Sequence, residues 1–300
     1  MALGVLFNLP ALQTANLVDR NSSRLQKTLR ELSSGSRINS AADDAAGLSL
    51  ANGMNANVAA LAQSVTNIAS DSSLLKVADG ALSQVTSLLN RAVSLASESA
   101  NGILNGAQRT AANDEYQSIL DEITNIGNTT TYNQKAVFGS KVDAYMGDST
   151  LIGSMIDEMN ITALSSSHLG DSGGSLTLTA PTSTTAGKIT YTAGTAADLS
   201  NTSLLNASDA QSTLVSLNAA ISAVSMQDGY LGAQINLMDS VGAVLATQEE
   251  NTLSALNAVQ SVDYATATSN LASEQVLMQT SIAALAQATQ SSQDVLKLIQ

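Results

Sequence analysis

The stretch from Met54 to Ala96 reads MNANVAA LAQSVTN IASDSSL LKVADGA LSQVTSL LNRAVSL A when it is divided into sevens. The first residue of each group is apolar, and these residues are Met54, Leu61, Ile68, Leu75, Leu82, Leu89 and Ala96. Residues seven apart lie on one face of a helix. The repeat therefore predicts a helix of more than about 40 residues, roughly 60 Å long.

A weaker stripe accompanies the first one and shifts by one residue near Asp79-Gly80. Its members are Val58, Val65, Ser72, Ala78, Val85 and Ala92. A stripe that drifts in this way suits a helical bundle better than a strict two-stranded coiled coil. Asn101-Gly102 should end the helix, because glycine readily adopts the left-handed conformation common after a last helical turn. A shorter helix over about 106–125 is predicted to follow.

The same seven-residue spacing recurs toward both ends of the chain, and it predicts helical arms there. The residues expected to carry assembly on these arms are Val18, Leu25, Leu29, Leu32, Leu271, Met278 and Leu285. The predicted seam of the central bundle consists of Leu61, Ile68, Leu75, Leu82, Leu89, Leu217, Val224, Leu231, Met238 and Leu245. A long helix with one narrow apolar stripe is marginal alone, so the arms should pack against each other and against copies of the chain.

The middle of the chain has the alternating pattern of strands. Strands are predicted at 141–146, 149–156, 175–179 and 188–192. Gly147-Asp148 is a plausible hairpin turn, and 171–174 and 193–196 are typical of loops. This β element is too small to fold as a domain of its own.

Together these patterns predict a mainly α protein. Its N- and C-terminal arms form a long coiled-coil-like helical bundle around a small β-rich middle segment. The predicted division is an N-terminal arm at 1–34, a spoke or linker at 35–53, the N-terminal half of the bundle at 54–140, a β-hairpin region at 141–170, a short variable segment at 171–205, the C-terminal bundle helix at 206–255 and a C-terminal arm at 256–300.

Charge is distributed unevenly along an acidic chain whose formal net charge is −13. Such a chain lacks the basic surface that nucleic acid binding requires. Five of the twelve basic residues are Arg20, Arg24, Lys27, Arg30 and Arg37, whereas the region after residue 197 has nine acids and a single base. The basic first helix and the acidic last helices can attract each other, or both can be solvated faces.

Catalytic and cofactor chemistry find little support. There is no cysteine, and His168 is the single histidine, expected in a surface loop. The neighbouring Asp43 and Asp44 project about 100° apart on a helix, so they favour a helix start over an acid–base pair. We expect no enzyme activity, no metal and no cofactor.

No segment is apolar for the roughly 18 residues that a membrane span needs. The apolar start is short and has no basic residue before Arg20, unlike a secretory signal. If the protein leaves the cell, we therefore expect a route that leaves the N-terminus uncleaved.

Several motifs resemble those of bacterial flagellins. Leu29-Arg-Glu-Leu-Ser-Ser-Gly-Ser-Arg-Ile-Asn-Ser-Ala-Ala-Asp-Asp-Ala-Ala-Gly-Leu48 is close to the family's Ser-Ser-Gly turn and its Asp-Asp-Ala-Ala-Gly-Leu motif. Ser97-Glu-Ser-Ala-Asn-Gly102 and Tyr132-Asn-Gln-Lys-Ala-Val-Phe138 are similar to a family helix end and to its Phe-Asn-Gly turn. The last residues, 293–300, look like the family's C-terminus. The likeness covers about 1–170 and 205–300.

This resemblance implies a structural subunit that is exported unfolded and polymerises with itself into an extracellular filament for swimming. Gly35, Arg37, Asp43, Asp44 and Gly47 would belong to the spoke between an inner-tube helix and an outer-shell helix. The implied partners are other copies of the chain, a flagellar export chaperone, and filament cap and junction proteins. Two alternatives are a hook–filament junction protein with the same terminal helices and a flagellin-like scaffold that carries an enzymatic insert.

Family members that the innate immune receptor TLR5 detects use a basic residue, a leucine and a glutamate. Arg91, Leu95 and Glu115 occupy the matching positions. Val93 and Ser94 stand where those members carry Arg and Glu. We therefore expect weakened recognition, and packing between protomers is an equal alternative role for Arg91 and Leu95.

Overall fold

The structure is a computed structural model, and it describes residues 8–146, 155–172, 175–179, 188–192 and 195–299. The chain folds into two compact units. We call residues 1–55 and 252–300 the arm unit and residues 56–251 the bundle unit. The fold is mainly α with a small β-rich middle, as the sequence predicts.

Five helices make up most of the described chain: α1 (Leu9–Ser34), α2 (Ala45–Ser99), α3 (Gly106–Thr129), α4 (Ala207–Gln260) and α5 (Tyr264–Ile299). The predicted spoke over 35–53 is too long, because α2 begins at Ala45 and not near Met54. The heptad pattern missed this part because Gly47 stands seven residues before Met54, where the repeat would need a large apolar residue. Likewise α3 ends at Thr129 and α4 runs on to Gln260.

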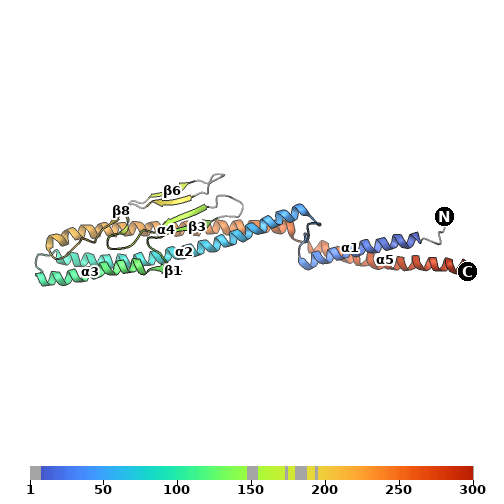
Figure 1. Cartoon of the computed structure of the whole chain (residues 1–300), viewed down its shortest axis with the longest axis horizontal. Coiled ribbons are helices and arrows are strands. Elements are labelled where there is room, and N and C mark those ends of the chain that lie inside the picture. Colours follow the sequence, from blue (N-terminus) through green and yellow to red (C-terminus); the bar gives the residue numbers. More distant parts are fainter. Residues whose placement is uncertain (1–7, 147–154, 173–174, 180–187, 193–194, 300) are drawn as a thin grey trace. The chain divides into compact units, whose positions relative to one another are not determined.

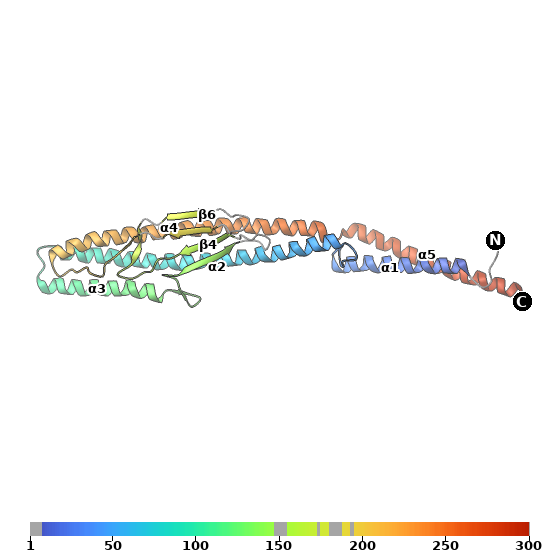
Figure 2. The same cartoon turned by 45° about the horizontal axis from the view of Figure 1, so that its top comes forward.

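In the arm unit, α1 and α5 lie side by side and antiparallel (Figures 1 and 2). The side-chain carbonyl of Asn8 caps α1 by accepting from the Ala11 amide at 3.0 Å, and Pro10 occupies the first turn. The Asn8 side chain also donates to the Ala288 carbonyl at 3.0 Å. Gly35 ends α1 with φ of 72°, a left-handed conformation that suits glycine.

In the bundle unit, α2, α3 and α4 pack around one apolar core. All ten predicted seam residues are buried in it, and Leu75, Leu82, Leu89, Leu217 and Leu231 are completely inaccessible. On α3 the core-facing residues are Tyr116, Ile119, Leu120 and Ile123. Large residues that repeat every seven positions thus find partners on two neighbouring helices.

The predicted companion stripe on α2 needs a correction. Ser64 is buried, whereas the predicted Val65 is only half-buried. Ser64 lies three residues after Leu61, the same spacing that separates Ala78 from Leu75. Ser72 is nevertheless buried four residues after Ile68, and Ala78 is buried three residues after Leu75, so the predicted change of spacing between these two members holds. The burial of Ser64 instead of Val65 is a local departure, because a buried serine looks like a surface residue in sequence.

Within the described residues, eight short strands interrupt the helices: β1 (Thr131–Tyr132), β2 (Lys135–Ala136), β3 (Lys141–Met146), β4 (Met155–Asn160), β5 (Leu169–Ser172), β6 (Ser175–Thr179), β7 (Lys188–Thr192) and β8 (Thr195–Ala197). They form two two-stranded sheets, β1-β2 and β5-β8, and a four-stranded sheet in the order β3-β4-β7-β6. The β4–β7 pair is parallel and the other pairs are antiparallel. Both views show the four-stranded sheet along α4 (Figures 1 and 2).

The strand predictions hold for 141–146, 175–179 and 188–192. Of the strand predicted at 149–156, residues 149–154 lie outside the described residues, and the last two belong to β4, Met155–Asn160, which pairs with Lys141–Met146 in register. The predicted Gly147-Asp148 turn lies outside the described residues. Segments predicted as loops contribute β5 and β8, because polar residues and glycine in these short strands hide the alternation.

Candidate assembly surface

The seam between α1 and α5 is shallow. Six of the seven residues predicted there are half-buried: Val18, Leu25, Leu32, Leu271, Met278 and Leu285. Leu29 does not belong to this seam, because 47% of its surface is exposed and its neighbour Thr28 is buried instead. Its role in assembly stays a prediction. Two helices alone cannot enclose their contact residues as three helices do.

Polar residues alternate with the apolar ones along this seam. The Asn21 side chain donates to the Ser281 hydroxyl at 2.7 Å and to the Leu277 carbonyl at 3.4 Å. Thr28 lies seven residues after Asn21 on α1 and is buried. Glu274 lies seven residues before Ser281 on α5 and is half-buried. Polar groups in a helical seam specify register at a cost in stability.

Large apolar side chains on both helices remain 47–59% exposed: Leu9, Leu12, Leu17, Leu29, Val276, Leu277 and Ile282. The two helices therefore leave a large part of their apolar surface uncovered by their own chain. These side chains form the outer apolar surface of the arms.

Charge does not join the two arms. In the described residues, no ion pair links α1 to α5, so the predicted attraction between them is not realised and the solvated-face alternative describes the helices better. Lys27 instead pairs with Glu31 at 3.8 Å and with Asp43 at 3.1 Å. Arg20, Arg24 and Arg30 are exposed on α1.

The segment 35–44 forms a joint between helix ends inside the arm unit. The Arg37 amide donates to the Gln260 carbonyl at 2.7 Å, and the Arg37 guanidinium donates to the Val259 carbonyl at 2.9 Å. The Val262 amide donates to the Gly35 carbonyl at 3.1 Å. A Cβ added to Gly35 would lie 2.9 Å from the Tyr264 hydroxyl, so this position has a close contact as well as a positive φ.

The two predicted spoke aspartates have separate structural roles. Asp44 caps α2 by accepting from the Gly47 amide at 2.9 Å, as a helix-start residue should. Gly47 leaves room for it, since an added Cβ would lie 2.4 Å from an Asp44 oxygen. Hydrogen bonds from Lys27 and then Ser40 hold the pKa of the Asp43 carboxyl below its usual value. The pair therefore does not perform acid–base chemistry.

Sequence reasoning missed the small core of this joint. Ile38, Ala51, Leu256 and Ala267 are all buried there. Ile38 stands between Arg37 and Asn39, so no periodic pattern surrounds it. An isolated large apolar residue in a polar segment was the available signal.

Arg91 and Glu115 form an exposed ion pair between α2 and α3, with 2.7 Å between the guanidinium and carboxylate. Leu95, which the resemblance groups with them, is only 3% exposed and belongs to the bundle core. Its role as a surface contact is therefore wrong, because the core takes up its side chain. Two of the three predicted residues remain on the surface.

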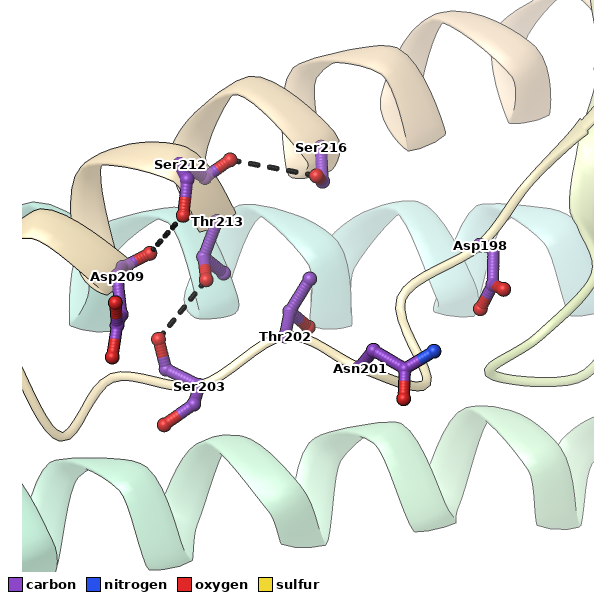
Figure 3. A pocket seen from close by; sticks show the side chains of 8 residues that line it. All are labelled: Asp198, Asn201, Thr202, Ser203, Asp209, Ser212, Thr213 and Ser216. Carbon is purple, nitrogen blue, oxygen red and sulfur yellow. Dashed lines mark hydrogen bonds between the residues drawn. The ribbon is translucent and has the colours of Figure 1, made fainter.

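A polar cleft of about 500 Å³ lies beside the start of α4 (Figure 3). Its lining residues are Asp198, Asn201, Thr202, Ser203, Asp209, Ser212, Thr213 and Ser216. Thr213 donates to the Ser203 carbonyl at 3.0 Å and Ser212 to the Asp209 carbonyl at 2.8 Å. The Ser200 hydroxyl and then its amide lower the pKa of Asp198. These contacts tie the loop to the helix and arrange no nucleophile beside a base.

Other chemical features are sparse. His168 is exposed in a tight turn, where its amide and the Ser165 amide each donate to the other residue's carbonyl. Among the described residues, no group of three or more histidines, aspartates or glutamates could hold a metal ion. Over the same residues, no helix combines the length and the apolar character that crossing a membrane requires.

Comparison with known proteins places these features in a family. The model of the bacterial flagellin N-terminal helical region matches residues 5–142, and the model of the C-terminal helical region matches 214–299. Flagellin of Halalkalibacterium halodurans is 31% identical over 97% of this chain and 98% of its own. Flagellin of Bacillus subtilis strain 168 is 32% identical with the same coverage of both chains. The flagellar filament 33 kDa core protein of Treponema phagedenis is 28% identical, again over 97% and 98%.

Neither family model nor any of these relatives favours a hook–filament junction protein. The two models cover the helices of both the arm unit and the bundle unit. The chain belongs to the bacterial flagellin family and is a structural subunit of the flagellar filament.

Proposed function

We propose that this flagellin polymerises through the outer apolar surface of its paired arms. The observation that carries the proposal is the exposure of large apolar side chains on both α1 and α5, although these helices already contact each other. In this assignment the inner arms are 1–34 and 256–300, and the spoke is the joint at 35–44. Gly35, Arg37, Asp43, Asp44 and Gly47 then hold the arms at the spoke.

Burial of these side chains by neighbouring copies supplies the free energy of assembly. Each large side chain gains about 1.5–3 kcal/mol on full burial. Contacts of this kind are heterologous, since the surface of α1 differs from that of α5. A heterologous contact that repeats without closing builds a helical polymer. The polar residues in the seam, Asn21 and Ser281, then keep the two arms in one register.

Deletion of residues 264–300 tests the role of the arms. Electron microscopy should show long filaments for the full chain and soluble subunits for the truncated chain, and filaments from the truncated chain would refute the proposal.

Two single substitutions on α1 make a finer test. Leu12→Glu should raise the critical concentration for polymerisation by at least about tenfold, since a charge replaces a buried contact. Gln13→Glu adds the same charge at the neighbouring exposed position and is the matched control. Equal effects of the two would contradict the assigned apolar surface.

The chain is further proposed to be exported and to work outside the cell as part of the filament. Relatives named as filament core proteins support this place. Other copies are the main partners, and an export chaperone together with filament cap and junction proteins are the other partners expected for a flagellin. Immunogold labelling of intact cells with an antibody to this chain should decorate filaments.

Recognition by TLR5 is proposed to be weak. Arg91 and Glu115 are exposed but bound to each other, Leu95 is buried, and Val93 and Ser94 depart from the receptor-binding pattern. Arg91→Asp breaks the ion pair, and motility and receptor signalling should both be assayed. Loss of motility with unchanged weak signalling would assign Arg91 to protomer packing.

The protein is proposed to act without catalysis or a cofactor. The structural role of the family supports this view. Purified filaments should show no hydrolytic activity, and such activity would revive the hypothesis of an enzymatic insert.

A further inference from the structure

An acidic side chain on α5 and two basic side chains on α1 have no ionic partner in the described structure of the arm unit. On α5, the Oε2 atom of Glu274 is buried and makes no hydrogen bond. On α1, Arg20 and Arg24 are exposed and take part in no ion pair or side-chain hydrogen bond. A carboxylate oxygen shielded from water without a donor is costly, so a charged donor would relieve it.

The other carboxylates of the joint are already occupied. Glu31 and Asp43 pair with Lys27. Asp44 caps α2, and Asp263 accepts from the Thr266 hydroxyl at 2.7 Å. Glu274 is thus an acid of α5 that remains open to a new partner.

Arg20 and Arg24 stand one helical turn apart on α1. At 100° per residue, Arg20 lies about 140° and 160° around the helix from the half-buried Leu25 and Val18, so it faces away from the contact with α5. Arg24 lies about 40° from the buried Thr28, at the edge of that contact. Neither guanidinium forms an ion pair within the described residues of its own chain, although that chain has a net charge of −13.

We propose that a guanidinium of Arg20 or Arg24 in one copy of the chain pairs with Glu274 of a neighbouring copy in the polymer. This inference rests on the proposed polymerisation through the arms and names the polar contact that accompanies the apolar one. Charge complementarity selects the occupant: a basic face meets an acid that its own seam leaves unpaired.

An alternative is that Arg24 pairs with Glu274 of its own chain in solution. The two residues lie at similar levels of the arms, since Glu274 stands opposite Thr28 and Arg24 is one turn before Thr28. Single charge reversals cannot separate the two cases. A mixture of two variant chains can, because it restores contacts between chains but not contacts within them.

The test uses full-length chains that polymerise on wild-type filament seeds, with the pelleted fraction as the readout. One variant carries Glu274→Lys, and the other carries Arg20→Glu and Arg24→Glu. Each alone should need an at least about tenfold higher concentration to polymerise than wild type. An equimolar mixture of the two should polymerise close to wild type.

Two controls keep the test specific. Arg30→Glu makes the same charge change about 120° around the helix from Arg24 and should shift the critical concentration by about twofold or less. Glu274→Gln removes the charge with little change of shape, and it should weaken polymerisation less than Glu274→Lys. Circular dichroism checks that all variants keep their helices.

The outcomes are distinct. Polymerisation of the mixture but of neither variant alone supports the contact between copies. A mixture that fails to polymerise overturns the proposal. If, in addition, a single chain with all three substitutions polymerises like wild type, the ion pair forms within one chain. Variants that all polymerise like wild type also overturn it and leave the apolar surface as the basis of assembly. Filaments from the 264–300 deletion would instead refute the proposed function itself.

Discussion

The bundle unit and the arm unit use the same heptad pattern but bury it to different depths. In the bundle, Leu75, Leu82 and Leu89 are completely inaccessible because α2 packs against both α3 and α4. In the arms, Leu25, Leu32 and Leu271 stay half-buried because each helix has a single neighbour in the chain. A heptad repeat therefore predicts which face makes contact, whereas the number of neighbouring helices decides how much free energy that contact contributes.

The largest expected effect on stability comes from comparing one leucine truncation in each unit. Leu82→Ala should destabilise the bundle by about 2–5 kcal/mol, because it opens a cavity in a closed core. Leu25→Ala should cost the monomer about 1 kcal/mol or less, because its site is already open to water. Urea unfolding of monomers at matched concentration measures both. Equal losses would break the comparison.

Glycine substitutions probe packing without removing a side chain. In α3, a Cβ on Gly127 would lie 1.9 Å from the Leu164 carbonyl oxygen, so Gly127→Ala should cost at least about 2 kcal/mol. Gly53 of the arm unit has open space around it, so Gly53→Ala should stabilise its helix by about 0.5–1 kcal/mol. Thermal unfolding shows whether each substitution raises or lowers the stability of the protein. A stabilising Gly127→Ala would show that the α3 contact is loose.

One aspartate in each unit should also respond to acid in opposite directions, Asp43 in the arms and Asp228 in the bundle. Bonds from Lys27 and Ser40 lower the pKa of Asp43, so its stabilising effect is present above pH about 3.8 and is lost as pH falls through the lowered value. Burial, and then the nearby Asp79 carboxyl, raise the pKa of Asp228 in the bundle. Its ionised form is penalised in the folded state, so stability falls as pH rises from about 3.8 through the raised value.

Thermal unfolding of Asp228→Asn and Asp43→Asn at pH 7, 5 and 3 checks this contrast. Asp228→Asn should stabilise the protein at pH 7 and lose that gain at pH 3. Asp43→Asn should destabilise it at pH 7 and matter less at pH 3. A loss of stability in Asp228→Asn at pH 7 would contradict the assigned repulsion.

The smallest expected effect concerns the β1–β2 turn of the bundle unit. Asn133 and Gln134 have φ of 48° and 64°, the left-handed pair of a type I′ hairpin turn. Gln134→Gly should stabilise the bundle by about 0.5–1 kcal/mol, since a side chain is unfavourable there. Asn133→Gly should gain less, because asparagine tolerates this conformation better. A destabilised Gln134→Gly protein would mean that the Gln134 side chain makes contacts that outweigh its backbone strain.

The helices with a clear apolar repeat were predictable from the sequence. Buried or capping polar residues were not. Large residues such as Leu61 and Met238 repeat every seven positions, so their burial was predictable. Ser64 and Thr28 are buried at positions where a polar side chain gives no such signal. The first turns of α2 were missed for the same reason, because Asp44 and Gly47 define that helix start by hydrogen bonding and not by an apolar pattern.

The candidate site was predictable in its location and not in its details. The heptads identified the arms, but Leu29 is exposed although its spacing fits the stripe. Leu95 shows a second difficulty, since a position matched by resemblance carries no information about its burial. The unpaired state of Arg24 and Glu274 depends on the orientation of two helices, which composition and spacing do not contain.

The joint has a mechanical consequence. At one level of the arm unit the backbone crosses between helices twice, once at Ser36 and once at Ser261, and these residues form an antiparallel bridge. The Arg37–Gln260 and Val262–Gly35 hydrogen bonds fasten the two crossings together. Tension along the arms is therefore divided between two covalent strands, and torque on one strand is passed to the other. Under load, the hydrogen-bonded segments at 35–37 and 260–262 should therefore act as one mechanical unit.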